Sequence, residues 1–136
     1  MSSTALQTVQ QIYAAFGRGD IPAIVERLAD DVQWETWAGN SAQAADVPWL
    51  RAGTGKAAAL SFFEQIGRFK FEDFQVLGLM ASDSQVAAEV TVDAVVPGGR
   101  RLRDEEMHLW NVNAAGQVTR FRHYADTAKH IAAAAR

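Results

Sequence analysis

The chain from Phe69 onward constrains the fold most, because strand-like segments follow one another there with turn signals between them. The predicted strands are Phe69–Met80, Gln85–Val96, Leu102–Val112 and Gln117–Ala125. Glycine-containing pairs, Gly98-Gly99 and Ala115-Gly116, separate the later strands and predict hairpin turns. Strands joined by such short turns pair antiparallel, so this half of the chain predicts an antiparallel sheet.

The first half of the chain predicts helices. Apolar residues in Thr4–Phe16 recur at the three-to-four spacing of an amphipathic helix. Asp20 is placed to cap a second, short helix whose apolar face extends to Leu28. A third helix is predicted over Thr54–Ile66, with Leu60 among its buried residues.

Two further segments complete the order of elements. Val32–Trp37 alternates as a strand does, and Thr127–Arg136 predicts a short alanine-rich helix. Gly39–Gly53 is a long connection, which in a small domain is often functional or mobile, so its Trp49 is a candidate for a lid over a site. Helices followed by antiparallel strands indicate an α+β fold, with helices on one face of a curved sheet.

Composition excludes several classes of function. The net charge of −3 provides no electrostatic basis for nucleic-acid binding, and the absence of cysteine excludes disulfides and thiolate ligands. The three histidines have no clustered spacing, so we expect no metal site, and we expect no cofactor. The sequence shows neither a signal peptide nor an apolar stretch long enough for a bilayer, so we expect a cytoplasmic protein without membrane contact.

The segment Glu106–Thr127 contains the most suggestive chemistry. Its two strands bring His108 and Asp126 to one neighbourhood. An imidazole can donate or accept a hydrogen bond near neutral pH, so His108 is a candidate to bind an oxygen atom of a ligand. The alternative is a structural histidine, bonded either to Glu106 on the same face of the strand or to a neighbouring strand.

Asp126 is a candidate general base, with its pKa raised by burial in an apolar pocket. The alternative is that its carboxylate caps the last predicted helix. Strand alternation also places Asp126 on the face opposite Phe121 and His123, which makes His123 a rival for the pocket.

Aromatic residues are candidates for lining a ligand pocket, although such residues also commonly form a core. Trp34 and Trp110 are the tryptophans we expect to orient a planar ligand through the indole N–H. With His123, the candidate pocket residues are Trp34, Trp110, Tyr13, Phe16, Phe63, Trp49 and Phe121.

Several local motifs together resemble a known family. They are Gly-Arg-Gly-Asp after the first helix, Leu-Ala-Asp-Asp-Val-x-Trp at the first strand, Thr-Gly-Lys before the third helix, and a closing Gly-x-Val-x-x-Phe-Arg-x-Tyr-x-Asp. This set is similar to the nuclear-transport-factor-2-like superfamily, and within it to the SnoaL-like polyketide cyclase and ketosteroid isomerase branch. The resemblance covers nearly the whole chain and implies one SnoaL-like domain over residues 1–136.

The resemblance implies a cone-shaped curved antiparallel sheet, packed against three helices of the N-terminal half and enclosing an apolar pocket. It also implies a homodimer formed through the outer face of the sheet. SnoaL-like cyclases act through a histidine and a late aspartate, which match His108 and Asp126. The isomerase pattern fits less well, because its tyrosine would fall on Ile12, one step before Tyr13, and its aspartate on Thr36.

Two hypotheses of function follow. In the first, a small hydrophobic carbonyl compound undergoes isomerisation, aldol-type cyclisation or dehydration, with Asp126 removing a proton and His108 stabilising the oxyanion. In the second, the same fold is a non-catalytic module for binding a hydrophobic ligand or for dimerisation. The hypotheses differ on whether His108 and a carboxylate point into one cavity.

Overall fold

A curved six-stranded sheet dominates the computed structural model, which describes residues 4–35 and 39–135. The strands are β1 (Leu28–Trp34), β2 (Gly53–Thr54), β3 (Lys70–Ala81), β4 (Gln85–Val95), β5 (Arg101–Val112) and β6 (Val118–Tyr124). They lie side by side in the order β2-β1-β6-β5-β4-β3.

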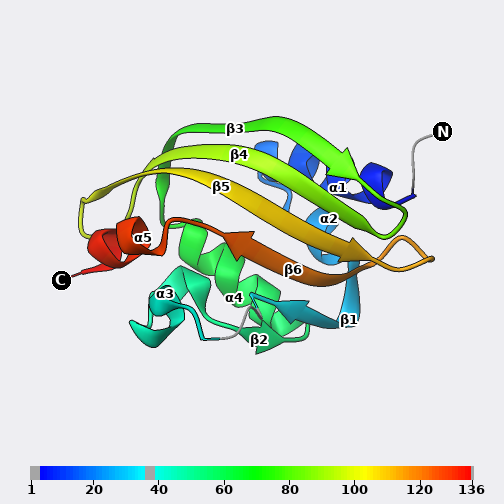
Figure 1. The fold of residues 1–136 in the computed structure, drawn as a ribbon, viewed down its shortest axis with the longest axis horizontal. Helices are drawn as coiled ribbons and strands as arrows, with labels where there is room; N and C mark the ends of the chain where they lie inside the picture. The colour runs from blue at the N-terminus through cyan, green and yellow to red at the C-terminus, as the bar shows by residue number, and fades with distance from the viewer. Residues whose placement is uncertain (1–3, 36–38, 136) are drawn as a thin grey trace.

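Helices from several parts of the chain pack with this sheet. In the described residues they are α1 (Thr4–Gly17), α2 (Ile21–Val25), α3 (Ser41–Ala44), α4 (Lys56–Ile66) and α5 (Thr127–Ala134), with a short 3-10 helix at Pro48–Leu50. Figure 1 shows α1, α2 and α4 behind the sheet, while α5 lies at one end of it. The α+β cone expected from the sequence is therefore confirmed.

Strand β5 shows how the sequence decides which side chains face the helices. Even-numbered residues from Leu102 to Val112 are buried and odd-numbered residues point outward, because successive side chains of a strand alternate between its faces. β5 pairs with β4 without interruption, from Asn111 opposite Gln85 to Arg101 opposite Val95.

The first strand departs from the expectation. β1 begins at Leu28, which the sequence placed on the face of the second helix, and α2 ends earlier, at Val25. Leu28 lies opposite Val118 in a parallel pairing of β1 with β6, and both side chains are fully buried. Sheet pairing and burial thus override the local helical pattern. Residues 36 and 37 of the predicted strand lie outside the described residues.

The connection Gly39–Gly53 contains more structure than expected, since α3, the 3-10 helix and β2 all form within or at its end. Its Trp49 is only 5% exposed and belongs to the core, so this side chain does not stand at an open loop tip. In α4, Leu60 is 41% exposed, so the prediction that it is buried is wrong.

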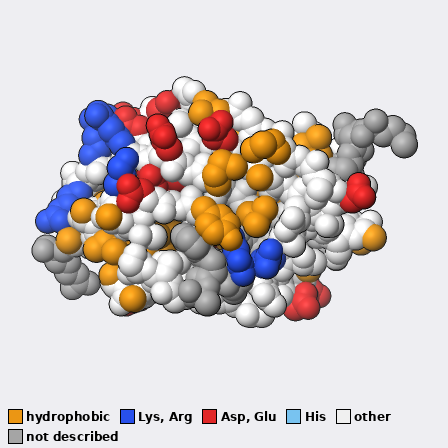
Figure 2. Space-filling model, in the orientation of Figure 1, with side chains coloured by type: hydrophobic (Ala, Val, Ile, Leu, Met, Phe, Trp, Pro, Cys, Tyr) orange, Lys and Arg blue, Asp and Glu red, His pale blue; other side chains and the backbone are white. Residues whose placement is uncertain are grey.

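The outer face of the sheet carries a mixture of charged and hydrophobic side chains, and Figure 2 shows the hydrophobic ones gathered over its middle. On β3, Leu77 and Met80 are 54% and 60% exposed. The homodimer expected through this face stays a prediction. None of the described helices combines the length and the apolar character that a membrane span requires.

A close approach between β2 and α4 yields a test of this packing. A Cβ atom at Gly53 would lie 2.6 Å from the Cβ of Ala58, whereas one at Gly78 on β3 would meet nothing within 4 Å. We expect Gly53→Ala to lower the free energy of unfolding by about 1–3 kcal/mol, because the helix must move away from the strand. Gly78→Ala is the matched control. Urea denaturation measures both, and equal stabilities of the two variants would contradict the packing described.

Candidate functional site

A small pocket lies between the inner face of the sheet and helices α1 and α4, with a cavity volume of about 70 Å³. Its walls are mostly aromatic, and its polar residues are Tyr13, Glu106, His108, His123 and His130. The other aromatic residues that line it are Phe16, Trp49, Phe62, Phe63, Phe69, Phe71, Phe74, Trp110 and Phe121.

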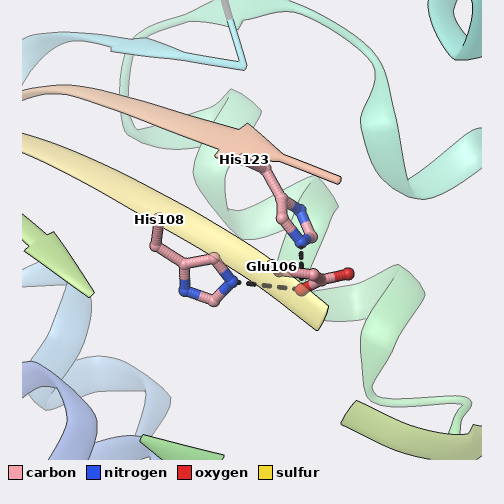
Figure 3. A group of neighbouring side chains, drawn as sticks. All are labelled: Glu106, His108 and His123. Carbon is pink, nitrogen blue, oxygen red and sulfur yellow. Dashed lines mark hydrogen bonds and ion pairs between the residues drawn. The ribbon is translucent and has the colours of Figure 1, made fainter. Parts of the chain in front are cut away.

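The polar groups reach this pocket because β5 and β6 present the same face to it. Glu106, His108 and Trp110 are alternate residues of β5, and all are buried on the inner face. On β6, His123 lies directly opposite His108 in the antiparallel register. Two imidazoles and a carboxylate therefore meet across one strand pair, as Figure 3 shows.

Glu106 is the centre of the polar network. Its Oε1 lies 2.6 Å from Nε2 of His123 and 3.2 Å from Nε2 of His108, while its Oε2 lies 3.0 Å from Nε2 of His130. Burial alone would raise the pKa of Glu106. The positive charge of His123 and the hydrogen bonds from all three histidines outweigh burial and hold this pKa well below its usual range.

His108 connects this carboxylate to helix α1. Its Nδ1 lies 2.7 Å from the hydroxyl oxygen of Tyr13, which also accepts a hydrogen bond of 3.0 Å from Nε1 of Trp110. Burial lowers the pKa of His108 more than Glu106 raises it, so the ring is neutral near pH 7. Burial also raises the pKa of Tyr13 far above its usual value, so the side chain stays a neutral phenol.

His123 faces a second carboxylate. Its Nδ1 lies 3.6 Å from Oε1 of Glu35, a fully buried residue directly after β1. Burial lowers the pKa of His123, but the charges of Glu106 and Glu35 outweigh this and raise it to about 9. The backbone of Glu35 adopts a left-handed φ of 56°, and a hydrogen bond of 2.9 Å from its N–H to the carbonyl of Phe121 holds it there.

His130 attaches helix α5 to the same network. Its Nδ1 accepts a hydrogen bond of 2.8 Å from Nε1 of Trp49. Because an indole N–H can only donate, Nε2 is the ring atom that carries the proton in the neutral imidazole. That Nε2 lies 2.8 Å from Oδ2 of Asp104 and 3.0 Å from Oε2 of Glu106, and it donates to both.

The structure brings most of the predicted site residues to one pocket. Trp34 is the exception among the predicted aromatic residues, because it lies behind the pocket wall and stacks on Phe121 with 4.5 Å between ring centroids. The indole N–H of Trp110 is directed to Tyr13. The predicted residues that line the pocket are Tyr13, Phe16, Trp49, Phe63, His108, Trp110, Phe121 and His123.

Asp126 is not brought to the pocket. It is exposed, and its Oδ1 accepts a hydrogen bond of 3.4 Å from the backbone N–H of Lys129, as the N-cap of α5. The chain leaves the sheet after Tyr124, and strand alternation turns His123 inward. The structure therefore matches the alternatives considered from the sequence: Asp126 caps a helix, and His123 lies in the pocket.

Sequence reasoning missed part of the network. It placed Glu106 beside His108 but did not identify it as a centre, and it gave no role to Asp104, Glu35 or His130. The two-residue alternation along β5 was the available signal for Asp104 and Glu106. Glu35 and His130 had no local signal, because only the folded chain brings β1 and α5 to β5.

Comparison with known proteins identifies similar chains. A family model described as SnoaL-like domain matches residues 9–121. None of the curated proteins matches the sequence. Solved structures do match, among them an NTF2-like protein of unknown function from Burkholderia pseudomallei, with 23% identity, 99% of this chain and 100% of that chain covered, and a TM-score of 0.77.

Two further similar structures are of proteins named for an activity. One is a putative polyketide cyclase from Xanthomonas campestris pv. campestris, with 26% identity, 97% of each chain covered and a TM-score of 0.72. The other is a Δ5-3-ketosteroid isomerase from Mycobacterium sp., with 21% identity, 90% of this chain and 93% of that chain covered, and a TM-score of 0.70. At this identity the isomerase likeness extends to the fold alone.

The position of Asp126 generates a test. We expect Asp126→Ala to lower the free energy of unfolding by about 1 kcal/mol, because the cap of α5 is lost, and Asp126→Asn to change it little, because asparagine also caps helices. Urea denaturation measures both. The ring signals of His108 and His123 in NMR spectra should be the same in Asp126→Asn as in the unaltered chain. A displacement of these signals would contradict the placement of Asp126 outside the pocket.

Proposed function

The chain belongs to the SnoaL-like domain family, and from this premise we propose that it is a cofactor-independent enzyme that moves a proton on a compact, largely apolar carbonyl compound. Isomerisation, aldol-type cyclisation and dehydration all share this step. The likeness to a putative polyketide cyclase at 26% identity supports carbonyl chemistry.

The observation that carries the proposal is one hydrogen-bonded chain along the wall of the apolar pocket. It runs from the hydroxyl of Tyr13 through both ring nitrogens of His108 to the carboxylate of Glu106. The carboxylate accepts from Nε2–H, which leaves Nδ1 with the lone pair that accepts from Tyr13. A carboxylate that fixes the tautomer of an imidazole is the arrangement by which catalytic dyads prepare a base.

The chemistry follows from these roles. A carbonyl oxygen that enters the pocket takes the hydrogen bond of Tyr13, which frees Nδ1 of His108. His108 then takes the proton from the carbon next to the carbonyl, and the electron pair of the C–H bond forms an enolate held by the phenol. Return of the proton to another carbon completes an isomerisation and restores neutral His108.

The electrostatics of the site support this assignment. A base must be neutral before it acts, and burial lowers the pKa of His108. Glu106 is ionised and accepts the Nε2–H, so it stabilises the imidazolium that forms. His108 thus takes the role of base that sequence reasoning gave to Asp126, and Tyr13 takes the role of oxyanion donor that it gave to His108.

Pocket size limits the substrate. A cavity of about 70 Å³ is smaller than the cavity of about 150 Å³ that holds benzene in an engineered protein. A ring compound therefore requires movement of side chains in the wall, and Phe71, which is 37% exposed, is the residue placed to move. Steroid-sized molecules require a much larger rearrangement.

A second candidate function is a non-catalytic binding module. The observation that favours it is that Tyr13 and His108 bond to each other and aromatic side chains fill most of the space. In that case the network stabilises the fold, and an apolar ligand binds without reaction.

Exchange of α protons for deuterium tests the proposal. In heavy water, with cyclopentanone and cyclohexanone as probes, NMR follows the exchange catalysed by the protein after treatment with a chelator. We expect Tyr13→Phe to lower the rate about 100-fold or more, because one phenolic donor to the developing oxyanion is lost. Tyr124→Phe is the matched control, since Tyr124 is exposed on β6, and we expect no change.

The result also separates the two candidates. Catalysed exchange that disappears in Tyr13→Phe while the variant remains folded supports the enzyme. Binding of a ketone without exchange supports the module. Equal rates in Tyr13→Phe and Tyr124→Phe remove Tyr13 from the mechanism.

A further inference from the structure

We propose that Glu106, His108 and His123 form a binding site for one divalent transition-metal ion, with an open coordination position that faces the apolar pocket. This site goes beyond the proposed function and does not depend on it, because metal binding is measured without any substrate.

The donor atoms are already gathered. One ligand atom from each residue lies within 4.8 Å of the others, and Figure 3 shows both imidazoles directed at the same carboxylate oxygen. In a tetrahedral zinc site the donor atoms stand about 3.3 Å apart. The distances from Oε1 of Glu106 to the Nε2 atoms of His108 and His123 are 3.2 and 2.6 Å. To reach this spacing from Oε1 of Glu106, Nε2 of His123 must move outward by less than about 1 Å.

Each proposed ligand also has a partner that can orient it. A histidine that binds a metal through Nε2 donates its Nδ1–H to an acceptor, and carboxylate ligands are themselves hydrogen-bonded. Tyr13 oxygen lies 2.7 Å from Nδ1 of His108, and Glu35 lies 3.6 Å from Nδ1 of His123. His130 holds the second oxygen of Glu106 at 3.0 Å, which leaves Oε1 for the metal.

A neighbouring group of possible ligands, Asp104, Glu106 and His130, is less suitable. Its histidine accepts at Nδ1 from the indole N–H of Trp49, so the proton resides on Nε2. The atom that faces the two carboxylates is therefore a donor and has no lone pair for a metal. The hydrogen bond from Trp49 is thus the difference between the two groups. It leaves His130 to orient the carboxylate of Glu106 rather than to bind the metal.

Charge also favours a cation at this position. Within residues 4–35 and 39–135, Asp104 and Glu106 form ion pairs with histidines and with no lysine or arginine. Carboxylates buried to this degree need compensation. A dication bound to Glu106 supplies it and replaces the protons that histidines otherwise provide.

The ligand set indicates the class of metal. Two imidazoles and one carboxylate suit zinc, cobalt or iron in the divalent state better than magnesium or calcium, which prefer oxygen ligands. Three protein ligands leave a position for a water molecule or a carbonyl oxygen. Because the ion occupies Nε2 of His108, the proton moves to Nδ1, and the metal-loaded protein loses the base of the metal-free mechanism.

Cobalt titration tests the site. The chain has three histidines, all buried in this network, and no cysteine, so a chain without an affinity tag offers no other imidazole or thiolate ligand. After treatment with a chelator, we expect Co²⁺ to produce visible absorption bands that saturate at one ion per chain. Zn²⁺ should abolish these bands by displacement.

Variants assign the ligands. We expect His123→Gln and His108→Gln to lose the bands, and His130→Gln, the matched control, to retain them at saturating Co²⁺ with at most a loss of affinity of about 10–100-fold. Circular dichroism checks that each variant is folded. Loss of the bands in His130→Gln with retention in His123→Gln would assign the metal to the neighbouring group and overturn the proposal.

A second measurement requires no variant. Addition of Zn²⁺ to the unaltered chain should displace the ring ¹⁵N signals of Nε2 in His108 and His123 far more than those of His130. Absence of both cobalt bands and zinc-induced shifts would overturn the metal site. Deuterium exchange in the chelator-treated protein is a separate readout, so failure of the metal site leaves the proposed function to its own test.

Discussion

The burial of the Glu106 carboxylate is the interaction on which the rest of the site depends. A buried carboxylate is stable only where donors surround it, and here the donors are three histidines from β5, β6 and α5. Each histidine is in turn held by a group from another part of the chain: Tyr13 of α1, Glu35 directly after β1 and Trp49 of the 3-10 helix. One acid thus couples α1, α5 and the 3-10 helix to the sheet.

The network also explains why an apolar pocket contains ionisable groups. Aromatic walls exclude water, and in such surroundings the energies of hydrogen bonds and charges increase. The same exclusion lowers the pKa of His108, which among the described residues has a single carboxylate partner, while His123, between two carboxylates, keeps its proton. Neighbouring imidazoles of one strand pair therefore differ in charge because of their partners rather than their depth.

The fold was predictable from the sequence because its signals are local. Alternation along β5 and the glycine turns determine the sheet, and the closing motif with Phe121 indicated the family. Predictions failed where distant pairing decides the outcome, as at Leu28, which enters the sheet beside Val118. The site was predicted in part for the same reason. His108 and His123 follow from strand parity, whereas the roles of Glu35 and His130 depend on contacts between distant segments.

The division of the pocket between segments has a consequence for how such a protein can diversify. Its acid and its three histidines all come from the contiguous run β5-β6-α5, whereas most of the aromatic wall belongs to α1, α4 and β3. Apart from Tyr13 on α1, the reactive groups and the shape-determining groups therefore occupy separate stretches of the chain. Substitutions at Phe16, Phe62 or Phe74 can change which molecule fits while the polar machinery stays intact. Except at Tyr13, the residues that react and the residues that select the ligand can therefore change independently.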